Sequence, residues 1–362
     1  MSTDKNTIKQ AQDQSYWAIV KRQFYKNRMA VWSLRFIIVI FATGTLADFI
    51  ANDKPIMCGY QGKTYFPIVN SYGVSMGISK WNREFANVDW HKLKFDWTIM
   101  PLIPYSPQYQ DYDNSDFKGP FDEQSVSSFR YKHLLGTDKL GRDVMAGMIQ
   151  GTRVAMLVGV ISMSISVFIG ILMGSLAGYY GDTRLKMSRG RLWFNLAALF
   201  FGFFYAFGVR SYALGDALSE GAGKFLGQFV LSIFIFALFM IVANIIAKLL
   251  KRIAFFGKQI TIPLDIVISR LMEVMTSIPS LLLILSICAL MKKPSIFITM
   301  CVIGVLGWVG IAKYVRAELL KVRSLEFIEA AQALGYSEMR IIMKHAIPNS
   351  LSSVLITIAF GI

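Results

Sequence analysis

The chain has 362 residues, of which 54% are hydrophobic and only 17% charged, and its mean hydropathy is +0.46. This composition excludes an ordinary soluble domain, because apolar runs of about 17–25 residues, each long enough to cross a bilayer, recur along it. The net charge of +15 would suit a nucleic-acid partner on a soluble protein. On a membrane protein it reflects Lys and Arg gathered on the cytoplasmic side, so we expect no nucleic-acid partner.

The first half of the chain is predicted to hold one span and a polar lobe. Residues 1–31 are polar and basic, and a first span covers residues 32–50. Residues 51–152 are polar and aromatic, with nearly balanced charge and prolines that oppose a long helix. We expect them to form a lobe outside the membrane. Continuous rather than alternating apolar runs argue against a β-barrel, so the fold class is an all-α polytopic membrane protein.

The remaining residues, 153–362, are predicted to hold the main transmembrane domain. Its apolar runs cover about 154–177, 192–209, 225–247, 274–291 and 295–312. A charged segment with a helical pattern follows at 313–350, and a last apolar run starts near Leu351. A run of about 12 residues cannot cross a bilayer. We therefore expect the rest of this last span to be missing from the sequence.

Charge predicts the orientation of the chain. The basic segments are 1–35, 179–191, 248–273 and 313–350. Placing the N-terminus in the cytoplasm puts all of them on the cytoplasmic side, and it puts the balanced lobe on the opposite side.

The loop between the last two predicted spans carries a recognisable pattern. Its positions are Glu329, Ala330, Ala331, Gly335, Ile347 and Pro348. Alanines let a partner surface approach closely, Gly335 can supply the positive φ that ends a helix, and Pro348 suits a first helical turn. The pattern resembles the EAA motif of ABC importer permeases, which forms a coupling helix for an ATPase. The alternative is an ordinary amphipathic loop helix.

A second pattern precedes the second span. It consists of Gly136, Thr137, Asp138, Gly141, Arg142 and Asp143. The glycines permit tight turns, and the charged residues suit a local polar network at the membrane interface. The pattern resembles the signature of the peptide/nickel branch of importer permeases, in the oligopeptide and dipeptide permease C type. We interpret it as structural rather than as a substrate site.

The resemblance continues elsewhere. The runs Gly178–Asp182, Ser277–Leu283 and Gly307–Gly310 are similar to family segments, and Ala51–Pro55 is similar to microcin C-type peptide permeases. The chain departs from the family by an insertion holding two extra predicted spans, at 192–247. The resemblance implies a type I-like transmembrane domain with a periplasmic lobe after the first span.

Glycines predict close helix packing within the second span. Gly170, Gly174 and Gly178 are four residues apart, on one helical face, where small side chains let another helix approach. The alternative is glycine that is merely tolerated in a membrane helix. Gly304, Gly307 and Gly310 suggest a similar face in a later span.

Several kinds of site are not predicted. The sequence has no Gly-x-x-x-x-Gly-Lys-Ser/Thr phosphate loop, so ATP hydrolysis requires a separate subunit. The three cysteines and three histidines have no metal-ligand spacing, and loop histidines are usually polar surface residues. No paired carboxylates and no series of ionisable residues lie in the middle of the predicted spans, as a proton-coupled carrier would tend to need. We expect no catalytic residue, no metal and no cofactor.

The resemblance therefore implies a permease subunit of an ATP-driven importer of oligopeptides or dipeptides in the bacterial inner membrane. Its partners would be a second homologous permease, two ABC ATPases, a periplasmic or lipid-anchored peptide-binding protein, and membrane lipids. The same machine with nickel, glutathione or a peptide antibiotic as cargo is an alternative. An ion-motive carrier, or a membrane-anchored interaction protein that uses the lobe, is another.

Overall fold

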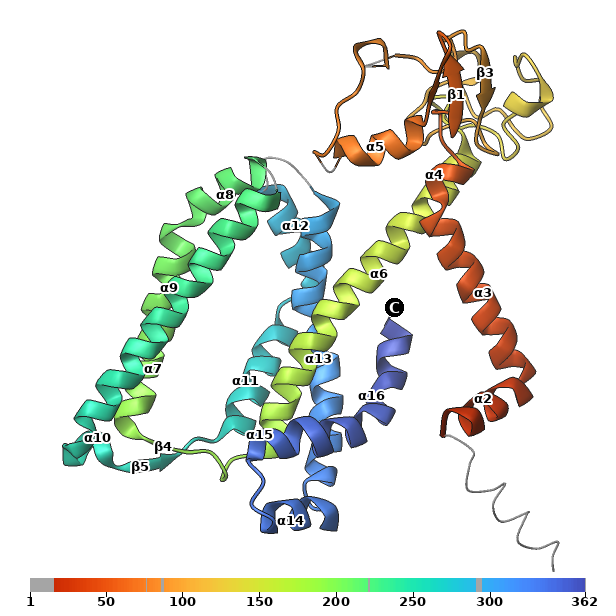
Figure 1. The fold of residues 1–362 in the computed structure, drawn as a ribbon. Coiled ribbons are helices and arrows are strands. Elements are labelled where there is room, and N and C mark those ends of the chain that lie inside the picture. Colours follow the sequence, from red (N-terminus) through yellow and green to blue (C-terminus); the bar gives the residue numbers. More distant parts are fainter. Residues whose placement is uncertain (1–15, 76, 86–87, 221, 291–294, 362) are drawn as a thin grey trace, which may run out of the picture. The chain divides into compact units, whose positions relative to one another are not determined.

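The computed structural model describes residues 16–75, 77–85, 88–220, 222–290 and 295–361. Residues 1–15 of the predicted N-terminal segment lie outside this description. The chain divides into two compact units, residues 1–157 and 158–362, whose elements are labelled in Figure 1.

The first unit begins with two helices, α2 (Tyr16–Lys26) and α3 (Arg28–Thr45). Asn27 separates them and caps α3, because its Oδ1 accepts a hydrogen bond from the Ala30 amide at 3.2 Å. Helix α3 is long and apolar enough to cross a membrane. It starts earlier than the predicted first span and ends at Thr45, where the one-turn helix α4 (Ala47–Ile50) follows.

The lobe contains a small antiparallel sheet that the sequence analysis did not predict. Its strands are β1 (Met57–Tyr60), β2 (Lys63–Tyr65) and β3 (Trp97–Ile99), in the order β2–β1–β3, and helix α5 (Pro67–Ser75) follows β2. Gln61 and Gly62 join β1 to β2 with φ of 52° and 73°, the left-handed backbone of a tight hairpin turn. Cys58 is a buried free thiol in β1.

After the sheet, irregular chain leads to α6 (Val144–Ser175). A buried apolar cluster of Ala51, Ile103, Tyr105 and Ala146 joins this chain to the first turn of the helix. Helix α6 therefore starts well before the predicted second span, and its first turns belong to the lobe. It ends in a π-helical turn, Leu176–Tyr180.

The second unit is centred on α6 and α13 (Ile296–Val322). Two buried hydroxyls join these helices: Ser162 donates to the Met300 carbonyl and Ser166 to the Gly304 carbonyl, each at 2.8 Å. Apolar side chains of α11 (Leu264–Ser277) and of the C-terminal segment complete the core.

Helix α11 and helix α12 (Ser280–Leu290) form a bent pair with an angle of 73° between them. Ile278, which precedes Pro279, has an extended backbone (φ −94°, ψ 125°), as residues before proline prefer. The predicted span at 274–291 is therefore not one straight helix: residues 274–277 belong to α11 and residues 280–290 to α12, and residue 291 lies outside the described residues.

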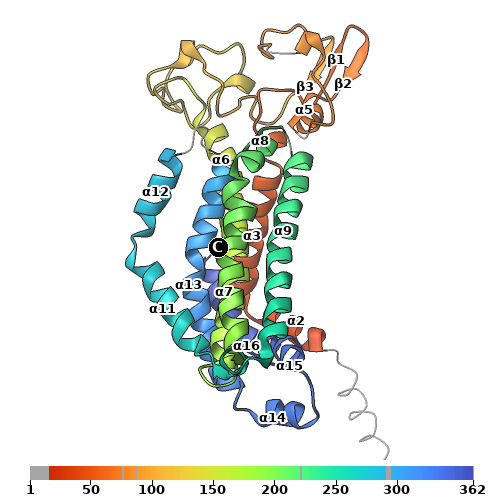
Figure 2. The same cartoon turned by 90° about the vertical axis from the view of Figure 1, so that its left-hand side faces the viewer.

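The insertion forms a long helical hairpin (Figure 2). Its elements are α7 (Arg189–Phe203) with a π-helical continuation to Val209, α8 (Ser211–Glu220), α9 (Ala222–Leu249) and α10 (Ala254–Gly257). Its extensive helix contacts are internal, between α7, α8, α9 and α10. Strands β4 (Lys186–Ser188) and β5 (Gln259–Thr261) pair antiparallel where the chain leaves and returns, with Ser188 opposite Gln259.

By length and apolar composition, five described helices can cross a membrane, or up to seven spans if each bent pair counts as one. The five are Arg28–Thr45, Val144–Tyr180, Arg189–Val209, Gly223–Arg252 and Ile296–Val322. The mostly helical, multi-pass fold that the sequence predicted is confirmed.

Candidate functional site

The segment with the alanine-rich pattern forms a short helix at one end of the second unit. Helix α14 (Glu326–Ala333) follows α13 after a tight turn, and α15 (Glu338–Ile341) comes next (Figure 2). Gly335 ends α14 with φ 76°. Its amide donates to the Gln332 carbonyl at 2.9 Å, and the Tyr336 amide donates to the Ala331 carbonyl at 3.2 Å. This pair of bonds is a Schellman cap, which requires the left-handed residue that glycine supplies.

One face of α14 is buried and the other is open. Ile328 and Ala331 pack into the core with Ile341 of α15. Glu329 and Ala330 are exposed, and Leu334 just beyond the helix is 73% exposed. The helix is thus fixed from behind, while its outer face and its cap are available to another molecule.

Polar contacts tie this segment to the end of α6. The side-chain amide of Gln332 donates from Nε2 to the Tyr179 hydroxyl at 3.4 Å, and Arg323 Nη1 donates to the Gly178 carbonyl at 3.3 Å. A displacement of α14 would therefore act directly on the π-helical turn of α6.

Helices α11 and α13 are joined by an ion pair at the same end. The Arg316 guanidinium forms a two-pronged bond with Asp265: Nη2 lies 2.7 Å from Oδ2, and Nε donates to Oδ1. Planar bidentate pairs of this kind fix orientation as well as distance. The two residues are 51 positions apart in the sequence, so no local pattern connects them.

Pro348 lies in the first turn of α16, as expected, although α16 continues helical chain that begins before it. The chain is helical from Glu338 onward, through a π-helical turn (Ile342–Ala346) into α16 (Ile347–Gly361). Proline lacks the amide that an uninterrupted helix would use, and the π turn just before it accommodates that loss. Ile347 lies beside this turn, partly buried against the core.

The three glycines of α6 lie against α13. A Cβ added at Gly170 would meet the Ile311 side chain at 2.7 Å, and one at Gly174 would meet the Ala312 carbonyl oxygen at 2.7 Å. At Gly178 it would lie 2.8 Å from the Arg316 carbonyl oxygen. No real Cβ approaches so closely, so the two backbones are at a separation that only hydrogen allows.

The second glycine set behaves differently. Gly304 and Gly307 face α6, where an added Cβ would meet the Ser162 carbonyl and the Ser166 hydroxyl within 3 Å. Gly310 has open space around it, so only two of the three glycines expected on this helical face pack against α6. A spacing of three rotates the third position away from the partner, whereas a spacing of four stays closer to one face.

The signature before α6 forms a folded loop inside the first unit. Gly136 and Gly141 both have positive φ, 78° and 77°. A Cβ there would lie 2.2 Å from the Lys118 carbonyl oxygen and 2.0 Å from that of Asp111, respectively. Glycine is therefore required at both positions for two reasons: another residue would strain the backbone at positive φ, and its Cβ would collide with a neighbouring carbonyl oxygen.

Its polar residues divide into two groups. Asp138 accepts hydrogen bonds from the Arg142 amide at 2.9 Å and from Arg142 Nε at 2.7 Å, forming an exposed turn. The Thr137 hydroxyl is buried and donates to the Asn114 carbonyl at 2.6 Å. Asp143 is also buried and caps α6, because Oδ1 accepts from the Ala146 amide at 2.6 Å.

His133 is buried, which corrects the expectation that the loop histidines are surface residues. Its Nδ1 lies 2.8 Å from Asp143 Oδ2 and its Nε2 lies 3.3 Å from Asp111 Oδ2, while Tyr105 stacks on the ring. Burial alone would lower the pKa of this imidazole, but the two carboxylates outweigh it and raise the pKa above its usual value. The loop is thereby fastened to α6 through the His133 ring.

Sequence reasoning missed Asp111, His133 and the partner role of Asp265. Asp111 and His133 stand in irregular chain without periodicity, so no local signal connects them. Within the described residues, no group of three or more His, Cys, Asp or Glu side chains is arranged so that it could hold a metal ion.

Two segments of the chain match families of known proteins. Residues 252–362, which include α14, match the family described as "binding-protein-dependent transport system inner membrane component". Residues 15–65 match the "N-terminal TM domain of oligopeptide transport permease C".

Relatives cover most of the chain. It is 26% identical over 353 residues to the inner membrane ABC transporter permease protein YejE of Escherichia coli, covering 96% of this chain and 76% of that one. It is 24% identical to the peptidoglycan transport system permease protein YejE of Agrobacterium fabrum, covering 94% and 73%. It is 22% identical to the oligopeptide transport system permease protein OppC of Haemophilus influenzae, covering 96% and 66%. In both matched segments and across these relatives, the chain is therefore similar to inner-membrane permease components of ABC importers.

Proposed function

We propose that this permease translocates oligopeptides or dipeptides in a complex with a second homologous permease and two ABC ATPases. A periplasmic or lipid-anchored binding protein delivers the cargo to the lobe side. The proposal extends to this chain what the names of its relatives state for them, which include oligopeptide, dipeptide and glutathione transport. Glutathione, itself a short peptide, is the second candidate cargo.

The structure of α14 supports a role for this helix in transmitting movement from an ATPase to the transmembrane helices. It is an eight-residue helix with a buried inner face, an open outer face and hydrogen bonds to the end of α6. An ATPase docked on the outer face, including Glu329, Ala330 and Leu334, pushes on a rigid support rather than on a free loop. Movement of α14 then shifts α6 and α13 together, since their backbones are in contact at the glycines.

The proposed orientation places α14 and the N-terminus in the cytoplasm and the lobe in the periplasm. The distribution of basic residues supports this orientation, because Lys and Arg gather on the cytoplasmic side of membrane proteins. With α14 in the cytoplasm, the other basic segments also fall on the cytoplasmic side; the segments are 179–191, 248–273 and 313–350. An accessibility measurement with a membrane-impermeant cysteine reagent on intact cells, at an added cysteine in place of exposed Phe121, tests it. Labelling from outside supports the orientation, and labelling only after lysis contradicts it.

Docking of the ATPase on α14 is tested by the same substitution at two glycines that have similar surroundings but lie in different units of the chain. Gly335 and Gly77 both have positive φ, 76° and 73°, and both have open space around the position of a Cβ. Gly335→Asp puts a charge on the proposed docking surface, whereas Gly77→Asp puts the same strain and charge on the lobe. The measurement is co-purification of a phosphate-loop ATPase with the tagged chain from native membranes. Loss with Gly335→Asp alone supports the proposal; equal recovery from both variants contradicts it.

Cargo is tested by uptake of labelled short peptides in cells with and without the gene. Unlabelled peptides, glutathione and nickel serve as competitors. Loss of ATP-dependent peptide uptake on deletion, with competition by peptides but not nickel, supports a peptide permease. Competition by nickel alone would contradict a peptide cargo and indicate that this importer transports nickel.

A further inference from the structure

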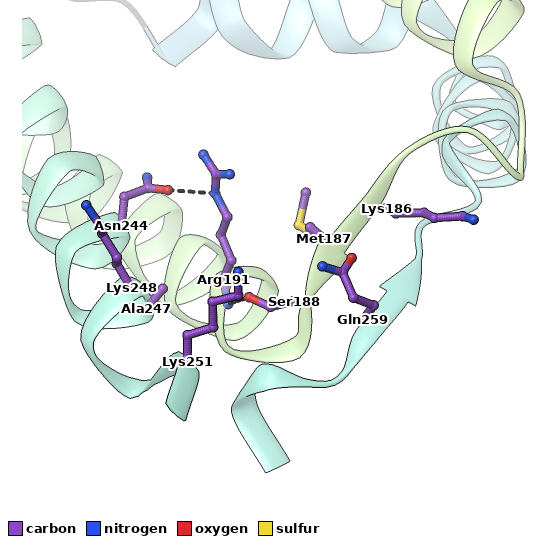
Figure 3. Close-up of a pocket in the computed structure, with 9 residues that line it drawn as sticks. All are labelled: Lys186, Met187, Ser188, Arg191, Asn244, Ala247, Lys248, Lys251 and Gln259. Atoms are coloured by element: carbon purple, nitrogen blue, oxygen red, sulfur yellow. Dashed lines mark hydrogen bonds between the residues drawn. The ribbon is translucent and has the colours of Figure 1, made fainter. Parts of the chain in front are cut away.

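A basic pocket lies at the base of the inserted hairpin, where β4 and β5 join it to the rest of the second unit. Its volume is about 380 Å³, and it is lined by side chains of α7, α9 and the two strands (Figure 3). It stands apart from α14 and from the glycine contact of α6 and α13. Neither the family match at 252–362 nor the proposed transport cycle gives it a role.

The lining is strongly cationic. Arg191, Lys248 and Lys251 surround it, with Lys186 pointing away at its rim (Figure 3). The residues 183–215 and 221–264 contain no Asp or Glu. In the part of the chain that the structure describes, no ion pair is formed by these four cations. Their charge is therefore not neutralised by the protein itself.

Arg191 is held in a defined position. Its Nε donates to Asn244 Oδ1 at 2.8 Å, and Asn244 is fixed in turn by bonds from its Nδ2 to the Met240 carbonyl at 2.8 Å and to Asn195 Oδ1 at 3.1 Å. Amides inside apolar membrane helices are costly unless they are hydrogen-bonded. This pair of amides orients one guanidinium edge and leaves the terminal nitrogens for an anion.

Apolar surface adjoins the charged pocket. Leu249, next to Lys248, is 71% exposed, and Trp193 and Ile245 on the adjacent helical turns are also exposed. Tryptophan is typical of the boundary between headgroups and acyl chains. An inorganic anion would use only the cations, whereas an amphiphile would use the cations and the apolar helices together.

We infer that this pocket binds the phosphodiester headgroup of an anionic phospholipid, with the acyl chains along α7 and α9. The shared chemistry with a free anion is phosphate recognition by one oriented guanidinium and two ammonium groups. The continuous apolar surface favours the lipid. The inserted hairpin then serves as a lipid-binding element at the end of the molecule that we propose faces the cytoplasm.

The test is native mass spectrometry of the full chain titrated with phosphatidylglycerol, and separately with phosphatidylcholine. The variants are Arg191→Gln, Lys248→Gln and Lys251→Gln, and the matched controls are Arg252→Gln and Lys258→Gln, exposed cations of the same region outside the pocket. We expect affinity for phosphatidylglycerol to fall about fivefold for each pocket cation removed and to stay within about twofold for the controls.

Three outcomes overturn the inference. Equal binding of the two lipids would show that charge is not recognised. An equal loss in pocket and control variants would reduce the effect to general surface charge. Displacement of the lipid by glycerol phosphate at similar concentration would assign the pocket to a free anion. Thermal unfolding of each variant identifies any that fails to fold, and the remaining pocket variants then decide.

Discussion

The His133 ring lies between the carboxylates of Asp111 and Asp143 and out of contact with solvent. Because its pKa is raised in the folded lobe, folding favours the protonated ring. Its contribution to stability is complete below the unfolded pKa of about 6.5 and is lost as the pH rises through the higher folded value.

We therefore predict that hydrogen exchange in the Asp111 and His133 loops accelerates beyond the intrinsic rate as the pH rises above about 6.5, and that His133→Gln removes this pH dependence. The measurement is exchange followed by mass spectrometry on the full chain. His345→Gln, a histidine change in the second unit, is the control and should keep the wild-type profile. The same pH dependence in His133→Gln would refute the assignment.

At Gly174 an added methyl group would collide with the main chain of α13, since its carbon would lie 2.7 Å from the Ala312 carbonyl oxygen. Gly174→Ala should lower the free energy of unfolding by about 1–3 kcal/mol. Gly151→Ala on the same helix meets nothing within 4 Å and should raise it slightly, as alanine does in open helix. Reversible unfolding in mixed detergents measures both; a loss no larger than the control's would contradict the packing.

The glycine spacing was readable from the sequence because helix periodicity is local, so Gly170, Gly174 and Gly178 predicted one face before any partner was known. The His133 network was not readable. Asp111 and His133 lie in chain without periodicity, and only the tertiary fold brings them together.

At the scale of elements, the spans could be predicted because hydrocarbon thickness sets their length. Their boundaries could not, since polar residues continue several helices beyond the apolar core: α13 runs on to Val322 and α6 starts at Val144. The strands of the lobe are three or four residues long, too short for an alternating pattern to be recognised.

The ion pair between α11 and α13 carries a prediction at this scale. Arg316→Met should destabilise the second unit by about 1–3 kcal/mol, between the values typical of exposed and buried pairs. Adding Asp265→Leu should recover part of the loss, because the unpaired carboxylate is removed. Unfolding of the two single variants and the double variant measures the coupling.

The control cycle uses Glu318 and Lys321, an exposed pair on α13 with 3.1 Å between Oε1 and Nζ. It should show coupling under about 0.5 kcal/mol. If the two cycles give equal coupling, Asp265 and Arg316 do not fasten α11 in place.

At the scale of the whole molecule, the inserted hairpin is a separable part of the second unit. Ser188 and Gln259 are partners in the β4–β5 ladder, and the Arg189 amide donates to the Lys258 carbonyl at 2.9 Å. The chain therefore returns to within a strand spacing of where it left. Two crossings are added together, so the direction of the later helices is unaffected.

Deleting residues 189–258 and joining the strands by an Asn-Gly turn should leave a folded, monodisperse protein. Size-exclusion chromatography and thermal unfolding of the purified variant test this. Removal of residues 264–290, which include α11 and its core side chains, is the contrasting deletion and should abolish folding. Loss of folding in both deletions would mean that the hairpin is part of the core.

The glycine contact between α6 and α13 has a consequence for how this lineage diverges. Main-chain atoms, not side chains, set the separation of the two helices at Gly170, Gly174 and Gly178. Mutation can replace most lipid-facing residues without altering that separation, but at these three sites any substitution widens it. At these three sites the sequence therefore has no freedom to vary without moving one helix away from the other.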